Sequence, residues 1–132
     1  MTKKFLKKII AQNQEDLRVI SALWSDSKIK HSEIKFLKNN KIFLIYLEGQ
    51  NKEKNNDKEK INSILKFEFI EKSISKNINQ NNDENILVLL AIDLFKKENN
   101  YEIILLFSNN GIITLYAEIM EVTLEDLKQV ND

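Results

Sequence analysis

The hydrophobic positions of the chain follow two periods, and the first clear one is helical. Leu17, Ile20 and Trp24 are three and four residues apart, a spacing that places them on one face of an α-helix. Asn13 precedes this segment and an acidic residue follows it three positions later, a pattern typical of a helix N-terminus. We therefore expect a helix over residues 14–25 that packs its apolar face, Trp24 included, against the core.

The other apolar segments have the composition and spacing of β-strands. Leu65, Phe67 and Phe69 alternate with polar residues, as in a strand with one buried face. Other segments are almost continuously apolar, and we interpret them as strands because of the strands around them. The expected strands cover residues 4–10, 28–37, 41–48, 65–69 with a continuation beyond it, 86–95, 101–107 and 112–122.

Asparagine and glycine mark the turns, since the chain contains no proline. Asn39 and Asn40 predict a tight turn that joins the strands on either side into a β-hairpin. The Asn-Asn-Gly sequence at 109–111 predicts a second hairpin turn, because these residues tolerate positive φ angles. The apolar positions change parity after Phe69, so a bulge or sharp bend is expected near Ile70.

The last apolar segment has a helical pattern. Thr123 and Asp126 are spaced like an N-cap and an acidic third residue of a helix. Leu124, Leu127 and Val130 then recur at intervals of three residues, which fits one face of a short helix. We expect a C-terminal helix here.

These elements predict an α+β protein, mainly an antiparallel β-sheet or partial barrel with a helix in the N-terminal half and a C-terminal helix. Closure into a seven-stranded barrel capped by the C-terminal helix would resemble the pleckstrin-homology fold. A length of 132 residues fits a single globular domain, 1–132. Two polar stretches, near 50–60 and 79–85, are expected to be mobile loops.

Composition excludes several classes of function. Lysine plus arginine and aspartate plus glutamate each number 20, so no net charge attracts nucleic acid or an anionic membrane. No apolar run approaches the ~20 residues of a membrane span. The lack of cysteine excludes thiolate chemistry and fits a reducing compartment, so we expect a soluble cytoplasmic protein. No phosphate-binding loop or dinucleotide motif is found and His31 is the only histidine, so no cofactor and no metal are expected.

Candidate chemistry is limited to a few charged residues. Asp93 interrupts an apolar strand, and a buried carboxylate there would need a partner such as Arg18, the only arginine, or a lysine. The alternative is that Asp93 points to solvent. Glu118 begins an acidic group that also contains Glu121, Glu125 and Asp126. Such a group would bind a hard cation or act in acid–base catalysis. The alternative is that Glu125 and Asp126 occupy the start of a helix and that Glu118 and Glu121 lie on opposite faces of a strand. Arg18, Asp93 and Glu118 are therefore the candidate ligand-binding residues, and no catalytic residue is assigned.

Several segments of the chain resemble an uncharacterised bacterial family, found mostly in alphaproteobacteria and catalogued as domain of unknown function 2948. They are an acidic cap and apolar helix ending in Ser-Ala at 15–22, Leu-Leu-Ala-Ile-Asp-Leu-Phe at 89–95, and Leu-Phe-Ser-Asn-Asn-Gly-Ile-Ile-Thr-Leu-Tyr-Ala-Glu at 106–118 with Leu-Glu-Asp-Leu at 124–127. The order and spacing match across nearly the whole chain. The resemblance implies no activity. It departs from the family after the first hairpin, where an arginine-rich segment is replaced by Leu-Glu-Gly-Gln-Asn at 47–51.

Our leading functional hypothesis is a non-enzymatic binding or adaptor module that engages an unidentified protein or a small ligand through a sheet face or a strand edge. An enzyme or metal-dependent accessory would instead bring its carboxylates together in a concave site. A weak RNA-binding module would need exposed aromatic rings flanked by lysines. The sequence leaves a homo-oligomer open, disfavours a nucleic-acid partner and predicts no membrane partner.

Overall fold

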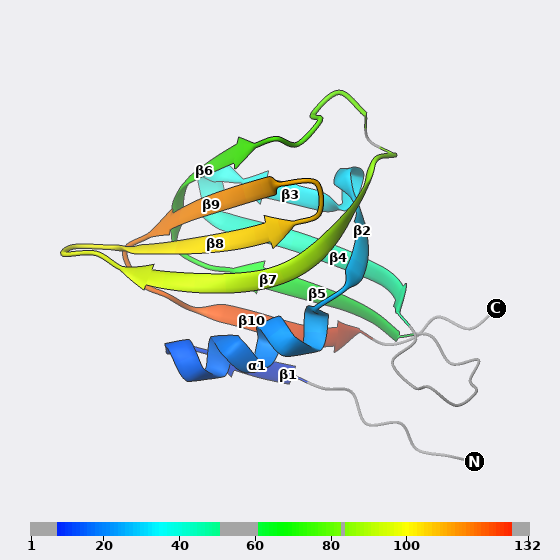
Figure 1. Ribbon diagram of the computed structural model, residues 1–132. Coiled ribbons are helices and arrows are strands. Elements are labelled where there is room, and N and C mark those ends of the chain that lie inside the picture. Colours follow the sequence, from blue (N-terminus) through cyan, green and yellow to red (C-terminus); the bar gives the residue numbers. More distant parts are fainter. Residues whose placement is uncertain (1–7, 51–60, 83, 128–132) are drawn as a thin grey trace, which may run out of the picture.

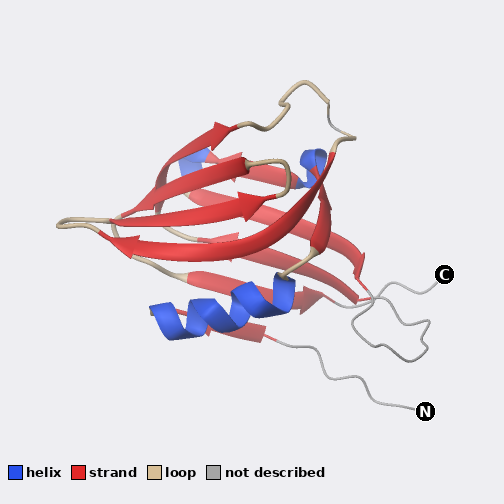
Figure 2. Ribbon diagram, viewed as in Figure 1, coloured by secondary structure: helices blue, strands red, loops and turns tan. Residues whose placement is uncertain are grey.

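Two five-stranded antiparallel sheets account for most of the chain (Figure 1; Figure 2). The computed structural model describes residues 8–50, 61–82 and 84–127. Sheet A contains, in spatial order, β1 (Lys8–Ala11), β10 (Val122–Leu127), β5 (Ile61–Phe67), β4 (Ile42–Gln50) and β3 (Ile34–Leu37). Sheet B contains β2 (Ser27–Lys30), β7 (Ile86–Lys96), β8 (Tyr101–Phe107), β9 (Gly111–Ala117) and β6 (Ile70–Lys76).

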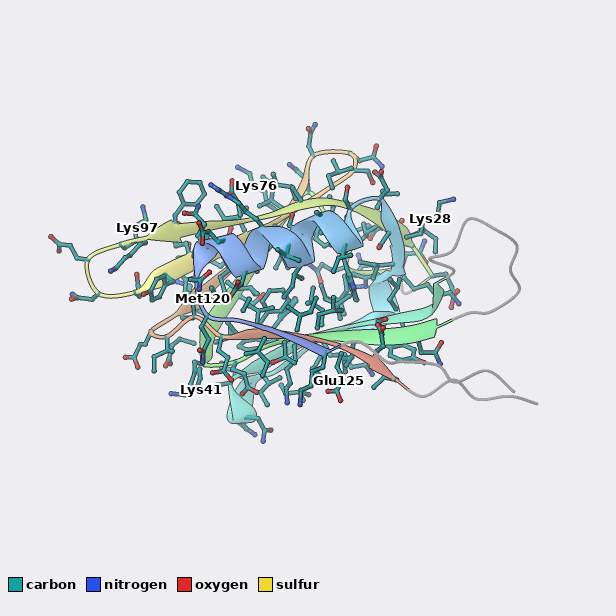
Figure 3. All side chains as sticks on the ribbon, turned by 90° about the horizontal axis from the view of Figure 1, so that it is seen from below. Lys28, Lys41, Lys76, Lys97, Met120 and Glu125 are labelled. Atoms are coloured by element: carbon teal, nitrogen blue, oxygen red, sulfur yellow. The ribbon has the colours of Figure 1, made fainter. Side chains whose placement is uncertain are left out.

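The hydrophobic core lies between the two sheets, whose inner faces are apolar (Figure 3). In sheet A, Leu124, Leu65 and Ile45 lie side by side on adjacent strands. In sheet B, Ile103 faces Leu115 across β8 and β9. All five side chains are at most 1% exposed. The alternation that predicted strands therefore directs one set of side chains from each sheet into a shared core.

The predicted N-terminal helix is confirmed as α1 (Gln14–Trp24), and it closes one side of the molecule between β7 and β1 (Figure 1). Leu17, Ile20 and Trp24 are buried, and the Asn13 side chain accepts a hydrogen bond from the backbone N–H of Asp16 at 2.9 Å. Trp24 is thus a core residue, as its spacing predicted.

The helix also completes the edge of β7. The short strand β2 pairs with β7 only between Ile86 and Leu89. Beyond that point the Ser21 hydroxyl of α1 accepts a hydrogen bond from the backbone N–H of Ile92 at 2.9 Å. A side chain of the helix therefore satisfies a backbone donor for which β2 is too short.

The bend expected near Ile70 is confirmed, and its consequence is larger than a bulge. β5 ends at Phe67 in sheet A, whereas β6 begins at Ile70 in sheet B. Phe69 has a φ angle of 60°, and the backbone N–H of Ile70 donates to the Lys41 carbonyl at 2.8 Å. The change of apolar parity therefore marks the place where the chain changes sheet.

The strand expected over 28–37 is instead two strands. A 3₁₀ turn at His31–Glu33 separates β2 from β3, and the two strands belong to different sheets. The expected hairpin is correct for β3 and β4, with a second 3₁₀ turn at Lys38–Asn40 and Lys41 at a φ angle of 58°. The hairpin at 109–111 is also confirmed, with Asn109 and Asn110 at positive φ angles.

The predicted C-terminal helix is wrong for the residues that the structure describes. Residues 122–127 form β10, which lies between β1 and β5 and pairs with both. Val122 and Leu124 are fully buried and Thr123, on the opposite face, is 8% exposed. Pairing with two neighbours satisfies the backbone groups of this segment on both sides, and that long-range gain outweighs its local helical pattern.

Of the two predicted alternatives, an antiparallel sheet and a partial barrel, the structure has the antiparallel arrangement, in two separate sheets. The seven-stranded closure with a capping C-terminal helix, which would resemble the pleckstrin-homology fold, is not found in the described ranges. The polar stretch at 79–85 connects β6 to β7, where the Asn79 and Asn82 side chains accept backbone hydrogen bonds from Asn81 and Glu84. The loop expected near 50–60 lies outside the described residues, apart from Gln50 at the end of β4. None of the described helices is long and apolar enough to cross a membrane.

Candidate binding face on sheet B

The three residues predicted as a site lie on different parts of the molecule. Arg18 is exposed on α1, Asp93 is exposed on β7, and Glu118 is exposed just after β9. Asp93 lines a hollow on sheet B, whereas Glu118 lines another beside the β7–β8 turn. No hydrogen bond or ion pair of the described residues joins any two of them. Their proposed role in ligand binding therefore remains a prediction for each residue separately.

The acidic residues near the end of the chain do not converge either. Glu121 accepts a hydrogen bond from the Gln12 side chain at 3.0 Å, while Glu125 lies opposite Lys8 in the backbone register of β10 and β1. Asp126 is 7% exposed and accepts a hydrogen bond from the Ser63 hydroxyl at 2.8 Å. Within residues 8–50, 61–82 and 84–127, no three histidine, cysteine or acidic side chains come together to hold a metal ion.

The structure reveals instead an apolar outer face on sheet B. β8 and β9 are apolar on both faces, so residues that do not enter the core point outward. Ile104 and Leu106 on β8 lie beside Thr114 and Ile112 on β9, and all four are only half-buried. α1 contacts β7 and β1 at the side of the molecule, away from this four-residue centre.

The strands on either side extend this surface, which we call the β6–β9 face. Ile74 on β6 is 43% exposed and Phe95 on β7 is 48% exposed. Between these strands lies a hollow of about 420 Å³. It is lined by Ile74, Lys76, Asp93, Phe95, Ile104, Leu106, Ile112 and Thr114. A hollow of this size matches a small-molecule or side-chain binding site, which is typically apolar with a few polar groups at its margin.

The register of the four strands orders the face into three rows. Each row crosses β7, β8, β9 and β6 in that order: Ala91–Leu106–Ile112–Lys76, Asp93–Ile104–Thr114–Ile74 and Phe95–Glu102–Tyr116–Lys72. A β-bulge between Leu89 and Ala91 adds Leu90, which is 47% exposed, at one end. The centre of the face is therefore apolar and its charges lie along the margins.

The marginal charges differ in sign between the two sides. Lys72 and Lys76 lie on β6, and the Lys72 ammonium is 5.4 Å from the centre of the Tyr116 ring. Asp93 lies on β7, where its carboxylate accepts a hydrogen bond from the backbone N–H of Leu94. Neither Lys76 nor Asp93 takes part in the ion pairs found among the described residues. Figure 3 shows Lys76 on the opposite side of the molecule from Glu125 of sheet A.

Sequence reasoning found one member of this face, Asp93, and missed the rest. A signal was present, because the segments at 101–107 and 112–117 are apolar at both parities. A strand with one solvated face normally alternates. Apolar residues on both faces of neighbouring strands indicate either a covering layer or a binding face. No described element covers the outer face of β8 and β9.

A family model described as Protein of unknown function (DUF2948) matches residues 7–132, nearly the whole chain. This is the family that the sequence segments resembled. No curated protein and no solved structure matches the chain.

Proposed function

The chain belongs to the family described as Protein of unknown function (DUF2948), and we propose that it is a non-enzymatic binding module that engages its partner through the β6–β9 face. The observation that carries this proposal is the apolar hollow of about 420 Å³ on a sheet face that no described element covers. A partner would bury Phe95, Ile74 and the four central side chains.

The energetic argument rests on exposed apolar area. Complete burial of a phenylalanine or isoleucine side chain contributes roughly 1.5–3 kcal/mol, so the half-exposed Phe95 and Ile74 would each contribute about 1 kcal/mol on binding. The central side chains add to this, whereas the marginal charges stay near solvent and set the orientation. The face thus has the apolar centre and polar margin of a protein interface.

The alternatives receive less support from the described residues. An enzyme or metal-dependent accessory needs converging carboxylates, but Asp93 and Glu118 line different hollows. RNA binding through the sheet needs several rings free to stack on bases, but Phe95 is the one aromatic residue that lines the hollow, and Tyr116 is half-buried beneath Lys72. The lack of cysteine supports a cytoplasmic location for the module.

Nuclear magnetic resonance with an apolar probe tests the proposal. The ¹⁵N-labelled protein is titrated with anilinonaphthalene sulfonate, and the backbone amides of β6, β7, β8 and β9 are expected to shift together. Phe95→Asp is expected to weaken probe binding, whereas the control Ile119→Asp, at a position that is 54% exposed outside the face, is expected to leave it unchanged. Shifts confined to another surface, or equal effects of the two variants, would show that the face is not the binding site.

A further inference from the structure

The charges of the β6–β9 face are arranged so that the face is complementary to itself. Acidic side chains, Asp93 and Glu102, lie on β7 and β8, and basic side chains, Lys72 and Lys76, lie on β6. Glu102 already forms an ion pair with Lys97 at 4.0 Å, so Asp93 is the acidic side chain that remains for a partner. The strand order β7-β8-β9-β6 therefore gives the face an acidic half and a basic half on either side of an apolar centre. A second copy of the chain, turned to face the first, can therefore place its basic half over the acidic half of the first copy.

We infer that the occupant of this face is a second copy of this chain, bound face to face about a twofold axis that lies in the interface and runs along the strands between β8 and β9. This inference rests on the proposed function, because it uses the same face. The rotation places β7 of one copy over β6 of the other and β8 over β9. Leu106 then lies opposite Ile112 of the second copy, which joins the two apolar centres.

The same rotation brings the unlike charges together. Asp93 lies opposite Ile74 on β6 of the second copy. Lys76 is two residues further along β6 and points from the same face. Successive residues on one face of a strand are about 7 Å apart, a distance that a lysine side chain spans. The symmetry makes this contact twice, once from each copy.

The other twofold arrangement of the two faces is disfavoured by its charges. An in-plane axis that runs across the strands would place β7 over β7 and β6 over β6. With the axis at the central row, Asp93 would approach its own symmetry copy, and Lys76 would lie opposite Lys72 of the second copy. Like charges brought together in an interface cost several kcal/mol, so the axis along the strands is selected.

The size of the face sets the strength of the dimer. Four strands about 4.8 Å apart and three rows about 7 Å apart define an area on the order of 400 Å² per copy. Stable interfaces bury about 800 Å² per partner. This small area fits a weak, transient interface, so we expect a dissociation constant on the order of 100 μM and dimerisation that depends on protein concentration.

Charge reversal tests the pairing directly by sedimentation velocity over a range of protein concentrations. The wild-type chain is expected to shift from monomer to dimer as its concentration rises. Asp93→Lys and Lys76→Asp are each expected to raise the dissociation constant at least about tenfold, because each places like charges together. An equimolar mixture of the two variants restores both pairs and is expected to dimerise again. Glu98→Lys and Lys28→Asp, exposed charges outside the hollow, serve as matched controls.

The outcomes separate this inference from the proposed function. A wild-type chain that remains monomeric up to about 1 mM, ten times the expected dissociation constant, overturns the inference. Single reversals that dimerise like the wild type, or a mixture that stays monomeric, overturn it as well. If the apolar probe still maps to the β6–β9 face in these cases, the proposed function stands with a different partner. Circular dichroism of each variant confirms that the exposed substitutions leave the fold intact.

Discussion

The hydrogen bond from the backbone N–H of Ile92 to the Ser21 hydroxyl joins α1 to sheet B, and its removal should be measurable. Ser21→Ala leaves the Ile92 donor without its partner at a half-buried position. An unsatisfied buried donor costs about 1–3 kcal/mol. Alanine is a better helix former than serine by roughly 0.5 kcal/mol. The two contributions predict a net loss of about 0.5–2 kcal/mol in the free energy of unfolding.

Two measurements check this prediction. Urea denaturation gives the change in the free energy of unfolding, and native-state hydrogen exchange gives the protection of the Ile92 amide itself. We expect faster exchange at Ile92 in Ser21→Ala than in the wild type. The control Ala22→Ser makes the reverse change at an exposed position of the same helix, so it should lose only the propensity difference of roughly 0.5 kcal/mol. An Ile92 amide that remains equally protected, with a more stable protein, would refute the bridging role of Ser21.

Other substitutions test the core, a hairpin and a buried polar pair. Leu124→Ala, on the inner face of β10, should lower the free energy of unfolding by about 2–5 kcal/mol, measured by urea denaturation; a loss below about 0.5 kcal/mol would contradict the burial of β10. Gly111→Ala should destabilise by about 1 kcal/mol in a thermal melt, because the added Cβ would lie 3.1 Å from the Ile78 side chain; an unchanged melting temperature would show that Ile78 moves freely. Ser63→Ala should lower stability by about 1–2 kcal/mol, because the Asp126 carboxylate loses a buried donor; a neutral result in urea denaturation would assign Asp126 entirely to its other contacts.

Local signals in the sequence predicted the elements whose stability is local. The helix over 14–25 was predicted because the Asn13 cap and the spacing of Leu17, Ile20 and Trp24 act within a few residues, and all of these were confirmed. The strand over 101–107 was predicted with the bounds that the structure has. The positive φ angles of the 109–111 turn are likewise a property of the residues in it.

Long-range pairing decided the elements that the sequence predicted incorrectly. Leu124 and Leu127 have helical spacing, but Leu124 lies opposite Leu65, a residue far away in the chain. The binding face depends on pairing in the same way. Asp93 was found because it interrupts an apolar segment, whereas Lys76 reaches the same hollow only because β6 pairs with β9 across the sheet. No local sequence pattern predicts that Lys76 and Asp93 line the same hollow, because this depends on the pairing and register of distant strands.

The position of β10 also determines when sheet A becomes complete. Among the described strands, the N-terminal strand β1 pairs only with β10, which in turn pairs with β5. During synthesis, β3, β4 and β5 can therefore assemble early, while β1 waits for more than a hundred further residues to emerge. Contacts of such large sequence separation slow folding, because loop closure must precede them. The first described strand therefore joins sheet A only after the last described strand, β10, has paired with β5.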